Sequence, residues 1–140
     1  MRLILFHGTP RKFTEFIYSP DGFYFAEDPV YAWGFAQTKA AHVENAEPGL
    51  LICEVTFERP RRVNLRSRFQ WDDFVYRGFP RSKDYDSVFA RVGGRIELKV
   101  YEPAQIRILT RLDEKSAAEY VRTYSDIHAN KIAAHTSARR

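Results

Sequence analysis

The pair Gly93-Gly94 separates two runs of strand-forming residues, 87–92 and 95–101. The turn of a tight β-hairpin needs positive φ at its central residues, and glycine reaches those angles without a steric penalty. The pattern therefore predicts an antiparallel hairpin. This pairing restricts the rest of the chain to folds that contain an antiparallel sheet.

Short apolar or alternating runs elsewhere predict further strands. Between residues 50 and 58, apolar and polar side chains alternate, which is typical of a strand with one buried face. Cys53 lies on the apolar side of this run, so we expect it in the core rather than as a nucleophile. Besides the hairpin, we expect strands at 2–8, 23–26, 50–58, 63–65 and 105–112.

Three segments carry helix signals. Asp28-Pro29 combines an N-cap residue with a proline in the first turn, and the helix that it opens should fade by 47–49. A second helix is expected at 69–76, with Ser67 as its cap. A third should run from 114 to about 134 and pack through a stripe of residues at helical spacing, namely Tyr120, Tyr124 and Ile127.

These elements predict an α+β fold with a mostly antiparallel β-sheet core, flanking helices and a C-terminal helix. The chain has 140 residues, of which 44% are hydrophobic, and this size and composition suit one globular domain. We expect residues 1–112 to form the body of that domain. Residues 113–140 should form a C-terminal helix and tail packed on the same body.

Cysteine content and apolar runs bear on the cellular compartment. A single cysteine cannot form an internal disulfide, and it cannot supply the usual thiolates of a structural zinc site. The first residues lack the apolar core of a signal peptide, and no run approaches the roughly 18 apolar residues of a membrane span. We expect a cytoplasmic protein that makes no contact with a membrane.

The net charge of +4 conceals an uneven distribution. Residues 59–83 contain eight basic and two acidic side chains, an excess of +6, whereas residues 1–58 contain four basic and eight acidic ones. Arginine suits bidentate contact with phosphate or carboxylate groups. Arg62, Arg66 and Arg68 are therefore candidates for binding an acceptor or a phosphate, the alternative being a solvated basic face.

Several common catalytic motifs are absent from the sequence. It contains neither a GxxxxGK[ST] nor a GxGxxG loop. The sequence therefore gives no support for a nucleoside triphosphatase or for a dinucleotide-binding fold. It also lacks HExxH and any cysteine and histidine spacing typical of a metal site, so we expect no metal. Three clusters remain as carriers of chemistry: His7-Gly8-Thr9, residues 22–26 with the helix after them, and Glu97.

These clusters, taken in order, resemble the signature segments of the ADP-ribosyltransferase superfamily. Residues 5–9 (LFHGT), 22–26 (GFYFA) with 30–36 (VYAWGFA), and 97–106 (ELKVYEPAQI) look like those of its His-Tyr-Glu type, the type of poly(ADP-ribose) polymerases and diphtheria toxin. The last segment is especially similar to small ADP-ribosyltransferase domains of phage polyvalent proteins and bacterial effectors. The resemblance implies a split, mostly antiparallel sheet and NAD as co-substrate.

The first motif would then bind NAD. In the family, the motif histidine, here His7, hydrogen-bonds a ribose hydroxyl, and the backbone of the next residue, here Gly8, pairs with the nicotinamide amide. Glycine permits such close backbone approach to a flat ring. Thr9 completes the motif. The alternative interpretation, from the strand pattern alone, is that His7 is a core histidine, because it follows Leu3 and Leu5 on one strand face.

The second motif would enclose the nicotinamide ring. The motif tyrosine, here Tyr24, stacks on the ring, and a second aromatic residue eleven positions later, here Phe35, covers its other side. The alternative is that both are core aromatics. This chain departs from the polymerase pattern by having Phe35 in place of tyrosine and Ala32 in place of a frequent serine. Gly34, inside the helix, suggests that some group approaches closely there.

Glu97 is the candidate catalytic residue. Cleavage of the bond between nicotinamide and ribose develops positive charge on the ribose, as in glycoside hydrolysis, and a fixed carboxylate stabilises that charge. Strand alternation places Glu97 on the polar face of its strand, and from this pattern alone we would expect its side chain to be exposed to solvent. Two positions earlier stands Arg95, where transferases that modify arginine often have an acidic residue, and this argues against arginine as acceptor.

The sequence therefore predicts a mono-ADP-ribosyltransferase, a pentosyl-transferring glycosyltransferase. It would move ADP-ribose from NAD to a protein side chain or a nucleic acid and release nicotinamide. Two alternatives stay open: a non-catalytic module that binds nucleic acid or protein, and a small-molecule (antibiotic) ADP-ribosyltransferase or NAD glycohydrolase. An effector, toxin or phage-encoded enzyme of this kind would act in the cytoplasm, either of its own cell or of a host or target cell.

Overall fold

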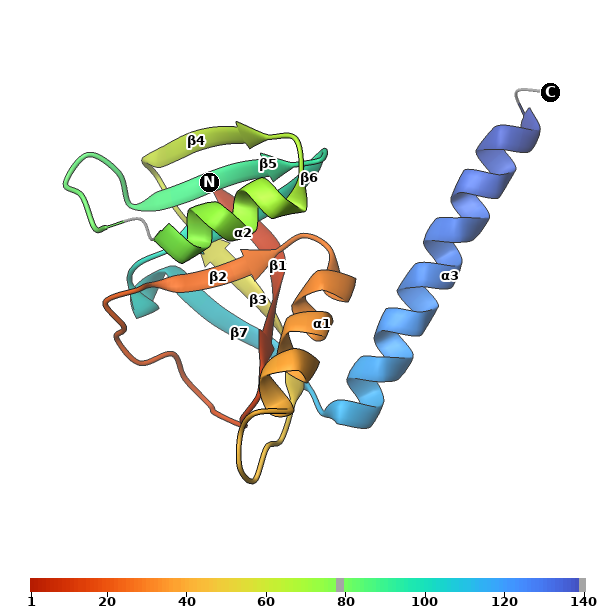
Figure 1. Cartoon of the computed structure of the whole chain (residues 1–140), viewed down its shortest axis with the longest axis horizontal. Coiled ribbons are helices and arrows are strands. Elements are labelled where there is room, and N and C mark those ends of the chain that lie inside the picture. The colour runs from red at the N-terminus through yellow and green to blue at the C-terminus, as the bar shows by residue number, and fades with distance from the viewer. Residues whose placement is uncertain (78–79, 139–140) are drawn as a thin grey trace.

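The fold is a seven-stranded sheet flanked by helices, seen in a computed structural model that describes the backbone of residues 1–77 and 80–138 and side chains up to residue 131 (Figure 1). In the described residues the strands are β1 (Arg2–Thr9), β2 (Phe23–Ala26), β3 (Gly49–Thr56), β4 (Pro60–Leu65), β5 (Ser87–Val92), β6 (Arg95–Val100) and β7 (Ile106–Leu112). The helices are α1 (Pro29–Ala40), α2 (Arg68–Arg77) and α3 (Glu114–Ala138), with a 3₁₀ turn, η1, at Pro103–Gln105.

The sheet has the order β4-β5-β6-β2-β1-β3-β7. All neighbouring strands pair antiparallel except β4 and β5, which are parallel. Three helices accompany this sheet, the last of them at the C-terminal end of the described chain. The α+β class with a mostly antiparallel core is therefore confirmed.

The sheet is divided between β1 and β2. These strands share a single registered pair, Phe6 with Ala26, whereas β1 and β3 remain in register from Arg2 to Thr9. Beyond Phe6 the edge of β1 has no partner on β2. The halves β4-β5-β6-β2 and β1-β3-β7 consequently part at this point.

The hairpin expected from the two glycines is confirmed. Gly93 and Gly94 have φ values of 57° and 85°, and they join β5 to β6, with Val92 opposite Arg95. Both strands have neighbours on their outer sides, β4 beside β5 and β2 beside β6. The hairpin thus forms the interior of one half of the sheet, and most of its side chains are buried.

Helix α1 begins as the sequence predicts and ends earlier. The N–H of Val30 donates to Asp28 Oδ1 at 2.9 Å, so Asp28 is its N-cap. The helix stops at Ala40 rather than near residue 47. Asn45 has a positive φ of 54°, and the N–H of Glu47 donates to the Pro10 carbonyl, which ties this segment to the end of β1. The chain leaves the helix to make that connection.

Helix α2 is confirmed, and the strand before it is longer than expected. The N–H of Gln70 donates to Ser67 Oγ at 3.3 Å, as a capping residue requires. β4 begins at Pro60, three residues earlier than predicted, because parallel pairing with β5 recruits the arginine-rich residues that lack a strand pattern of their own.

Helix α3 packs on the body through its first turns and then extends away from it (Figure 1). Ala117 is fully buried, and the Tyr120 ring lies 5.7 Å from that of Phe6. Ile127, however, is 52% exposed. The predicted docking stripe therefore contacts the body at its beginning and leaves Ile127 outside. Residues 139–140 of the expected tail lie outside the described residues.

Among the described residues, three clusters of buried side chains hold these elements together. The largest lies between the two halves of the sheet and includes Phe25, Phe57 and Cys53. Cys53 is fully buried, and burial raises the pKa of its thiol to about 12. This placement supports a core role for Cys53 rather than a nucleophilic one. The second cluster joins α1 and α3 to β1 and β3, and the third joins α2 to β5.

Candidate functional site

A cavity of about 480 Å³ opens where the two halves of the sheet part. Its size falls within the range of small-molecule sites, and its lining is mostly apolar with a few polar groups. Five elements contribute: β1, β2, α1, α2 and β6. Among the side chains and backbone groups that line it are six of the predicted site residues, His7, Gly8, Tyr24, Phe35, Arg68 and Glu97.

Glu97 lies on β6 with only 5% of its surface exposed, although the strand pattern alone suggests a solvent-exposed position. α2 covers this face of the sheet, and Arg68 from α2 donates from Nη1 to Glu97 Oε1. Burial raises the pKa of Glu97 to about 7, while the nearby Arg68 charge opposes the rise. Oε2 forms no hydrogen bond with any described residue. The carboxyl group is therefore buried, charge-paired through one oxygen and ionisable near neutral pH.

Arg68 has two further contacts that fix its guanidinium group. Its Nε lies 3.4 Å from Asp72 Oδ1, one helical turn further along α2. Its guanidinium carbon lies 4.6 Å from the centre of the Tyr31 ring, on α1. The sequence suggested Arg68 as an acceptor or phosphate ligand, and the fold brings it to the candidate catalytic carboxylate.

His7 is held by β2 and surrounded by aromatic rings. Its Nδ1 lies 2.7 Å from the Tyr24 carbonyl oxygen, and because a carbonyl only accepts, Nδ1 carries the proton. Burial lowers the pKa of His7, which favours the neutral ring with Nε2 as an acceptor. The rings of Phe16 and Phe25 lie 5.0 and 5.4 Å away.

Gly8 is required by the packing of α1 against β1. A Cβ atom at this position would stand 1.8 Å from the Ala32 carbonyl oxygen, a distance that no side chain tolerates. The glycine of the motif thus has a structural explanation that the sequence did not suggest. Gly8 nevertheless lines the cavity, at the part of β1 that β2 leaves unpaired.

Thr9 has a local structural role. It is buried, and its Oγ1 donates to the Arg11 carbonyl at 2.7 Å and accepts from the Arg11 N–H at 3.3 Å. These bonds form a side-chain turn at the end of β1. The Thr9 hydroxyl is therefore directed to the backbone, and Thr9 is not among the described residues that line the cavity.

Tyr24 lines the cavity from β2 and packs against Trp71, with their ring centres 6.3 Å apart. Lys99 Nζ lies 5.1 Å from the centre of the Tyr24 ring. Burial raises the pKa of the Tyr24 hydroxyl and lowers that of the Lys99 ammonium group. Sequence reasoning did not assign Trp71 to this site, since it lies outside the three motifs.

Phe35 lies on α1 and is 51% exposed at the cavity, and Lys39 Nζ lies 5.6 Å from its ring centre. An aromatic side chain with this exposure contributes little to the core. Tyr24, by contrast, is half-buried. A Cβ atom added at Gly34 would have no atom of the described residues within 4 Å. The packing of the described chain therefore gives no reason for this glycine.

An ion pair that the sequence analysis did not predict joins Asp28 to Arg95 near the site. Asp28 Oδ2 lies 2.6 Å from Arg95 Nη1, so the N-cap of α1 is tied to β6 two residues before Glu97. Arg95 also lies 3.4 Å from the Tyr124 hydroxyl and 3.3 Å from His128 Nε2, both on α3. These contacts connect α1, β6 and α3.

The remaining two predicted arginines are not brought to the cavity. Arg62 lies on β4, with its guanidinium carbon 5.0 Å from the centre of the Phe89 ring. Arg66 follows β4 and is exposed. Within the described part of the chain neither residue lines the cavity, so Arg62 and Arg66 stand apart from Arg68.

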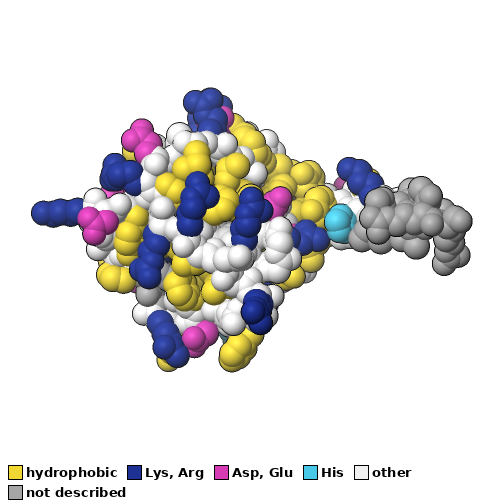
Figure 2. Space-filling view, turned by 90° about the horizontal axis from the view of Figure 1, so that it is seen from above, with side chains coloured by type: hydrophobic (Ala, Val, Ile, Leu, Met, Phe, Trp, Pro, Cys, Tyr) yellow, Lys and Arg dark blue, Asp and Glu magenta, His cyan; other side chains and the backbone are white. Residues whose placement is uncertain are grey.

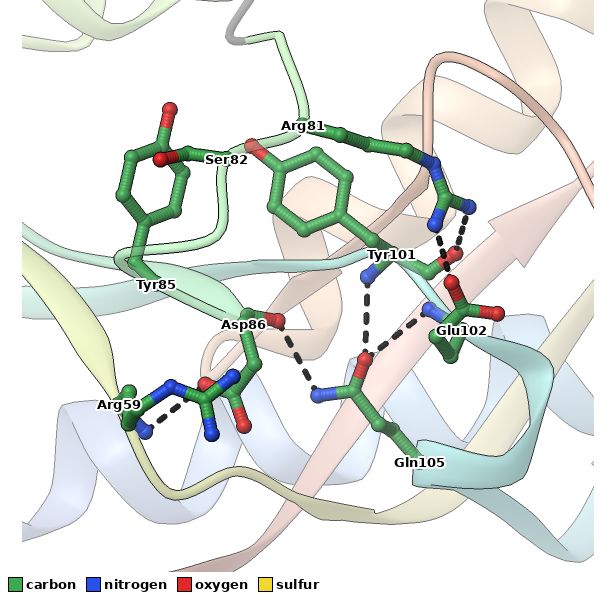
Figure 3. Close-up of a pocket in the computed structure, with 8 residues that line it drawn as sticks. All are labelled: Arg59, Arg81, Ser82, Tyr85, Asp86, Tyr101, Glu102 and Gln105. Carbon is green, nitrogen blue, oxygen red and sulfur yellow. Dashed lines mark hydrogen bonds and ion pairs between the residues drawn. The ribbon is translucent and has the colours of Figure 1, made fainter.

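Gln105, in the last signature segment, has a structural role at a second, smaller cavity of about 160 Å³ (Figure 3). Its Oε1 accepts from the N–H groups of Tyr101 and Glu102, and its Nε2 donates to the carbonyls of Thr56 and Asp86. Figure 3 shows this amide at the centre of the residues around it. The motif glutamine therefore fastens η1 to the end of β3 and to the residue before β5, a reason for its presence that involves no ligand.

No protein-family model matches the chain, and no curated protein matches it significantly. Among the described residues, no three or more histidine, cysteine, aspartate or glutamate side chains gather as a metal site would require. None of the helices that these residues form has the length and apolar character to cross a bilayer.

Proposed function

We propose that the protein is a mono-ADP-ribosyltransferase that transfers ADP-ribose from NAD to a macromolecular acceptor and releases nicotinamide. The observation that carries the proposal is the convergence of His7, Gly8, Tyr24, Phe35 and Glu97 on one cavity of about 480 Å³. These residues come from three motifs that lie up to ninety positions apart in the sequence. Membership of the ADP-ribosyltransferase superfamily is part of the same proposal.

The nicotinamide end of NAD would lie between Tyr24 and Phe35. Offset stacking between aromatic rings adds to the free energy gained from burying them. Gly8 would contribute backbone hydrogen bonds, because β1 has no partner on β2 beyond Phe6. His7 Nε2, as an acceptor, suits a ribose hydroxyl, which can donate to it. Lys39 and Arg68, both at the cavity, supply positive charge for the diphosphate.

Glu97 would act on the ribose that carries nicotinamide. The bond between ribose C1′ and the nicotinamide nitrogen breaks, nicotinamide leaves with the electron pair, and C1′ becomes positively charged before the acceptor's nucleophile bonds to it. A carboxylate held in a buried site stabilises this charge more in the transition state than in the ground state. Oε2 of Glu97 would accept from the ribose 2′-hydroxyl, while Oε1 keeps its bond from Arg68.

Nicotinamide release from NAD tests this proposal directly. We expect the intact chain to release nicotinamide and Glu97→Gln to lower the rate at least a hundredfold, because the amide cannot carry the compensating charge. Glu54→Gln is the matched control: Glu54 is another strand glutamate paired with arginines, and it does not line the cavity. Thermal melting of both variants checks that each is folded.

The acceptor class is identified by adding cell lysate and labelled NAD to the reaction. An increase in release together with label on macromolecules supports transfer. Release that is unaffected by lysate, with free ADP-ribose as product, would replace the proposal with an NAD glycohydrolase. If the folded intact chain neither binds NAD nor releases nicotinamide, the enzyme proposal is wrong, and a non-catalytic binding module becomes the better description.

A further inference from the structure

Asp72, on α2, places a second carboxylate at the cavity, and the proposed mechanism has given it no role. The residues by which α2 lines the cavity recur at helical spacing and share one face of the helix, namely Arg68, Trp71, Asp72 and Val75. Trp71 is buried, whereas 63% of the Asp72 side chain is exposed. Asp72 therefore stands at the rim of the cavity, where the protein meets solvent.

One guanidinium group joins Asp72 to Glu97. Arg68 Nε lies 3.4 Å from Asp72 Oδ1, and Arg68 Nη1 donates to Glu97 Oε1. The two carboxylates are thus bound to different nitrogens of one planar group. Burial raises the pKa of Glu97, and the nearby charge of Asp72 adds to the rise. The site therefore contains a buried and an exposed carboxylate close to each other.

The other acidic residues near the cavity lie in different positions. Asp28 is buried and caps α1. Asp21 lines the cavity beside Tyr24, where burial and the Asp21 charge raise the pKa of that tyrosine. Among the described carboxylates that line the cavity, Asp72 is the one that an arginine joins to Glu97.

The side of Asp72 that faces away from the cavity is open to an approaching molecule. Its neighbours on the helix surface there are Phe69, three residues earlier, and Tyr76, four residues later. They are 80% and 91% exposed, so no described element covers them. Apolar side chains are also exposed between charged ones on the side of the molecule where β4 lies in Figure 1 (Figure 2). Exposed aromatic residues of this kind suit contact with a protein.

Transfer of ADP-ribose to a hydroxyl group requires a base. The hydroxyl oxygen bonds to ribose C1′ as the bond from C1′ to the nicotinamide nitrogen breaks, and nicotinamide leaves with the electron pair. The hydroxyl proton must then pass to another group. Glycosidases meet a similar requirement with two carboxylates beside the glycosidic bond, and in the inverting enzymes one of them activates the nucleophile. Glu97 and Asp72 supply such a pair.

We infer that Asp72 is the catalytic base that binds the acceptor hydroxyl, takes its proton and passes it to solvent, and that the acceptor is a serine, threonine or tyrosine side chain of a protein. The inference rests on the proposed function and adds the group that acts on the acceptor. A carboxylate acceptor would carry no proton for Asp72 and would be repelled by it. A cationic lysine or arginine acceptor would be repelled by Arg68, which lies beside Asp72.

A nucleic-acid hydroxyl fits the rim of the cavity less well than a protein hydroxyl. Phosphates flank every sugar in a nucleic acid, and Asp72 and its neighbour Asp73 present two carboxylates on the exposed part of α2. Like charges at this short range repel each other. The exposed rings of Phe69 and Tyr76 and the absence of a charge on the acceptor group both favour a protein side chain.

The test separates transfer of ADP-ribose from hydrolysis of NAD. The full chain is incubated with labelled NAD and cell lysate, and labelled protein and free ADP-ribose are both measured. The reaction is run at pH 8, above the pKa of about 7 of Glu97, so that loss of the Asp72 charge leaves Glu97 ionised. We expect Asp72→Asn to lower the ratio of protein label to free ADP-ribose at least tenfold, because an amide cannot take the proton.

Nicotinamide release without lysate should remain within threefold of the unaltered chain in Asp72→Asn. Water is present at the open rim in large excess and needs no side chain to bring it to the ribose. Asp72→Glu retains a carboxylate beside Arg68 and should restore the ratio to within about threefold. Asp73→Asn is the matched control, because Asp73 pairs with Arg77 and is not among the described residues that line the cavity. It should leave the ratio unchanged.

An unchanged ratio in Asp72→Asn, or an equal fall in Asp73→Asn, would overturn the inference. Equal losses of transfer and of release without lysate would make Asp72 a support for Arg68 rather than a base. Label that neutral hydroxylamine removes would also overturn it, because hydroxylamine cleaves esters of carboxylate acceptors and leaves hydroxyl linkages intact. Label released by nuclease rather than protease would show that the acceptor is a nucleic acid and not a protein.

Failure of this inference is distinguishable from failure of the proposed function. If nicotinamide release depends on Glu97 and Asp72→Asn transfers label normally, the proposed function stands and Asp72 is not the base. If the folded intact chain releases no nicotinamide, the proposed function itself is wrong. Thermal melting of each variant shows that it is folded.

Discussion

Arg68, on α2, donates a hydrogen bond to Oε1 of Glu97, on β6, and both residues line a cavity that neither element forms alone. Its guanidinium group is fixed against the Tyr31 ring and Asp72, so the positive charge stays beside the carboxylate. Burial raises the pKa of Glu97, and the Arg68 charge lowers it. The two effects together place the pKa at about 7.

Nicotinamide release should therefore depend on pH through Glu97. Only the carboxylate form stabilises positive charge on the ribose, so we expect the rate to be about tenfold lower at pH 6 than at pH 8. Arg68→Met should move the midpoint to higher pH, because it removes the cation that favours the carboxylate. The other charges that reach Glu97 are those of Asp72 and Asp28, both of which raise its pKa.

Arg77→Met is the control for this profile, since Arg77 lies on the same helix, pairs with Asp73 and does not line the cavity. Its midpoint should match that of the unaltered chain. If Arg68→Met leaves the midpoint of the pH profile unchanged, Arg68 does not set the ionisation of Glu97.

The same ionisation should affect stability. The pKa of Glu97 is higher in the folded chain than its ordinary value of 4.5, so the folded state binds more protons between pH 4.5 and 7. Stability from this group is present below that window and is lost as pH rises through it. Glu97→Gln lacks the effect. Relative to this variant, the unaltered chain should lose on the order of 3 kcal/mol of unfolding free energy between pH 4 and pH 8, measured by denaturant titration.

Gly8 and Gly34 offer opposite outcomes for the same substitution. Gly8→Ala places a methyl group against the Ala32 carbonyl oxygen and should cost roughly 2 kcal/mol or more, because α1 must move off β1. Gly34→Ala meets no described atom within 4 Å and should stabilise α1 by up to about 1 kcal/mol. Thermal unfolding distinguishes them, and equal melting temperatures would contradict the close approach of α1 to β1.

Asp28 combines a helix cap with an ion pair, and two substitutions separate the roles. Asn retains the acceptor for the Val30 N–H and loses the charge that pairs with Arg95, whereas Ala loses both. We expect Asp28→Ala to be less stable than Asp28→Asn by about 1 kcal/mol, the usual value of an N-cap. Denaturant unfolding at pH 7 measures the difference. Equal stability of the two variants would show that the cap contributes little here.

Phe35 tests NAD binding without disturbing the core. It is 51% exposed, so Phe35→Ala should leave the melting temperature within about 2 °C, since an exposed side chain contributes little to folding. If Phe35 covers the nicotinamide ring, the KM for NAD should rise several-fold, as expected when roughly 1 kcal/mol of stacking is lost. Val30→Ala is the matched control, an exposed apolar position on the same helix that does not line the cavity. An unchanged KM would exclude Phe35 from the binding site.

Local chemistry in the sequence predicted much of the fold. The positive φ angles of Gly93 and Gly94, the Asp28 cap and the alternation through 50–58 each depend on neighbours only a few residues away. Such features are encoded locally, and for this reason the hairpin, the start of α1 and β3 could be predicted. The order of the three motifs also identified several of the residues that line the cavity.

Other features depended on contacts between distant segments. β4 extends to Pro60 because β5 pairs with it, and α1 ends at Ala40 because Glu47 bonds to the Pro10 carbonyl. Alternation placed Glu97 on the polar face of its strand, yet it could not show that α2 covers that face. Arg62 and Arg68 look alike in the sequence, and only Arg68 reaches the cavity.

The sequence by itself thus determined which residues are strands, caps and turns, since those preferences arise from each residue and its near neighbours. The tertiary structure decided which charges are buried, which glycine is indispensable and which arginine meets Glu97. Burial and pairing depend on what another part of the chain places against a residue. For Glu97 that part is α2, about thirty residues earlier in the sequence.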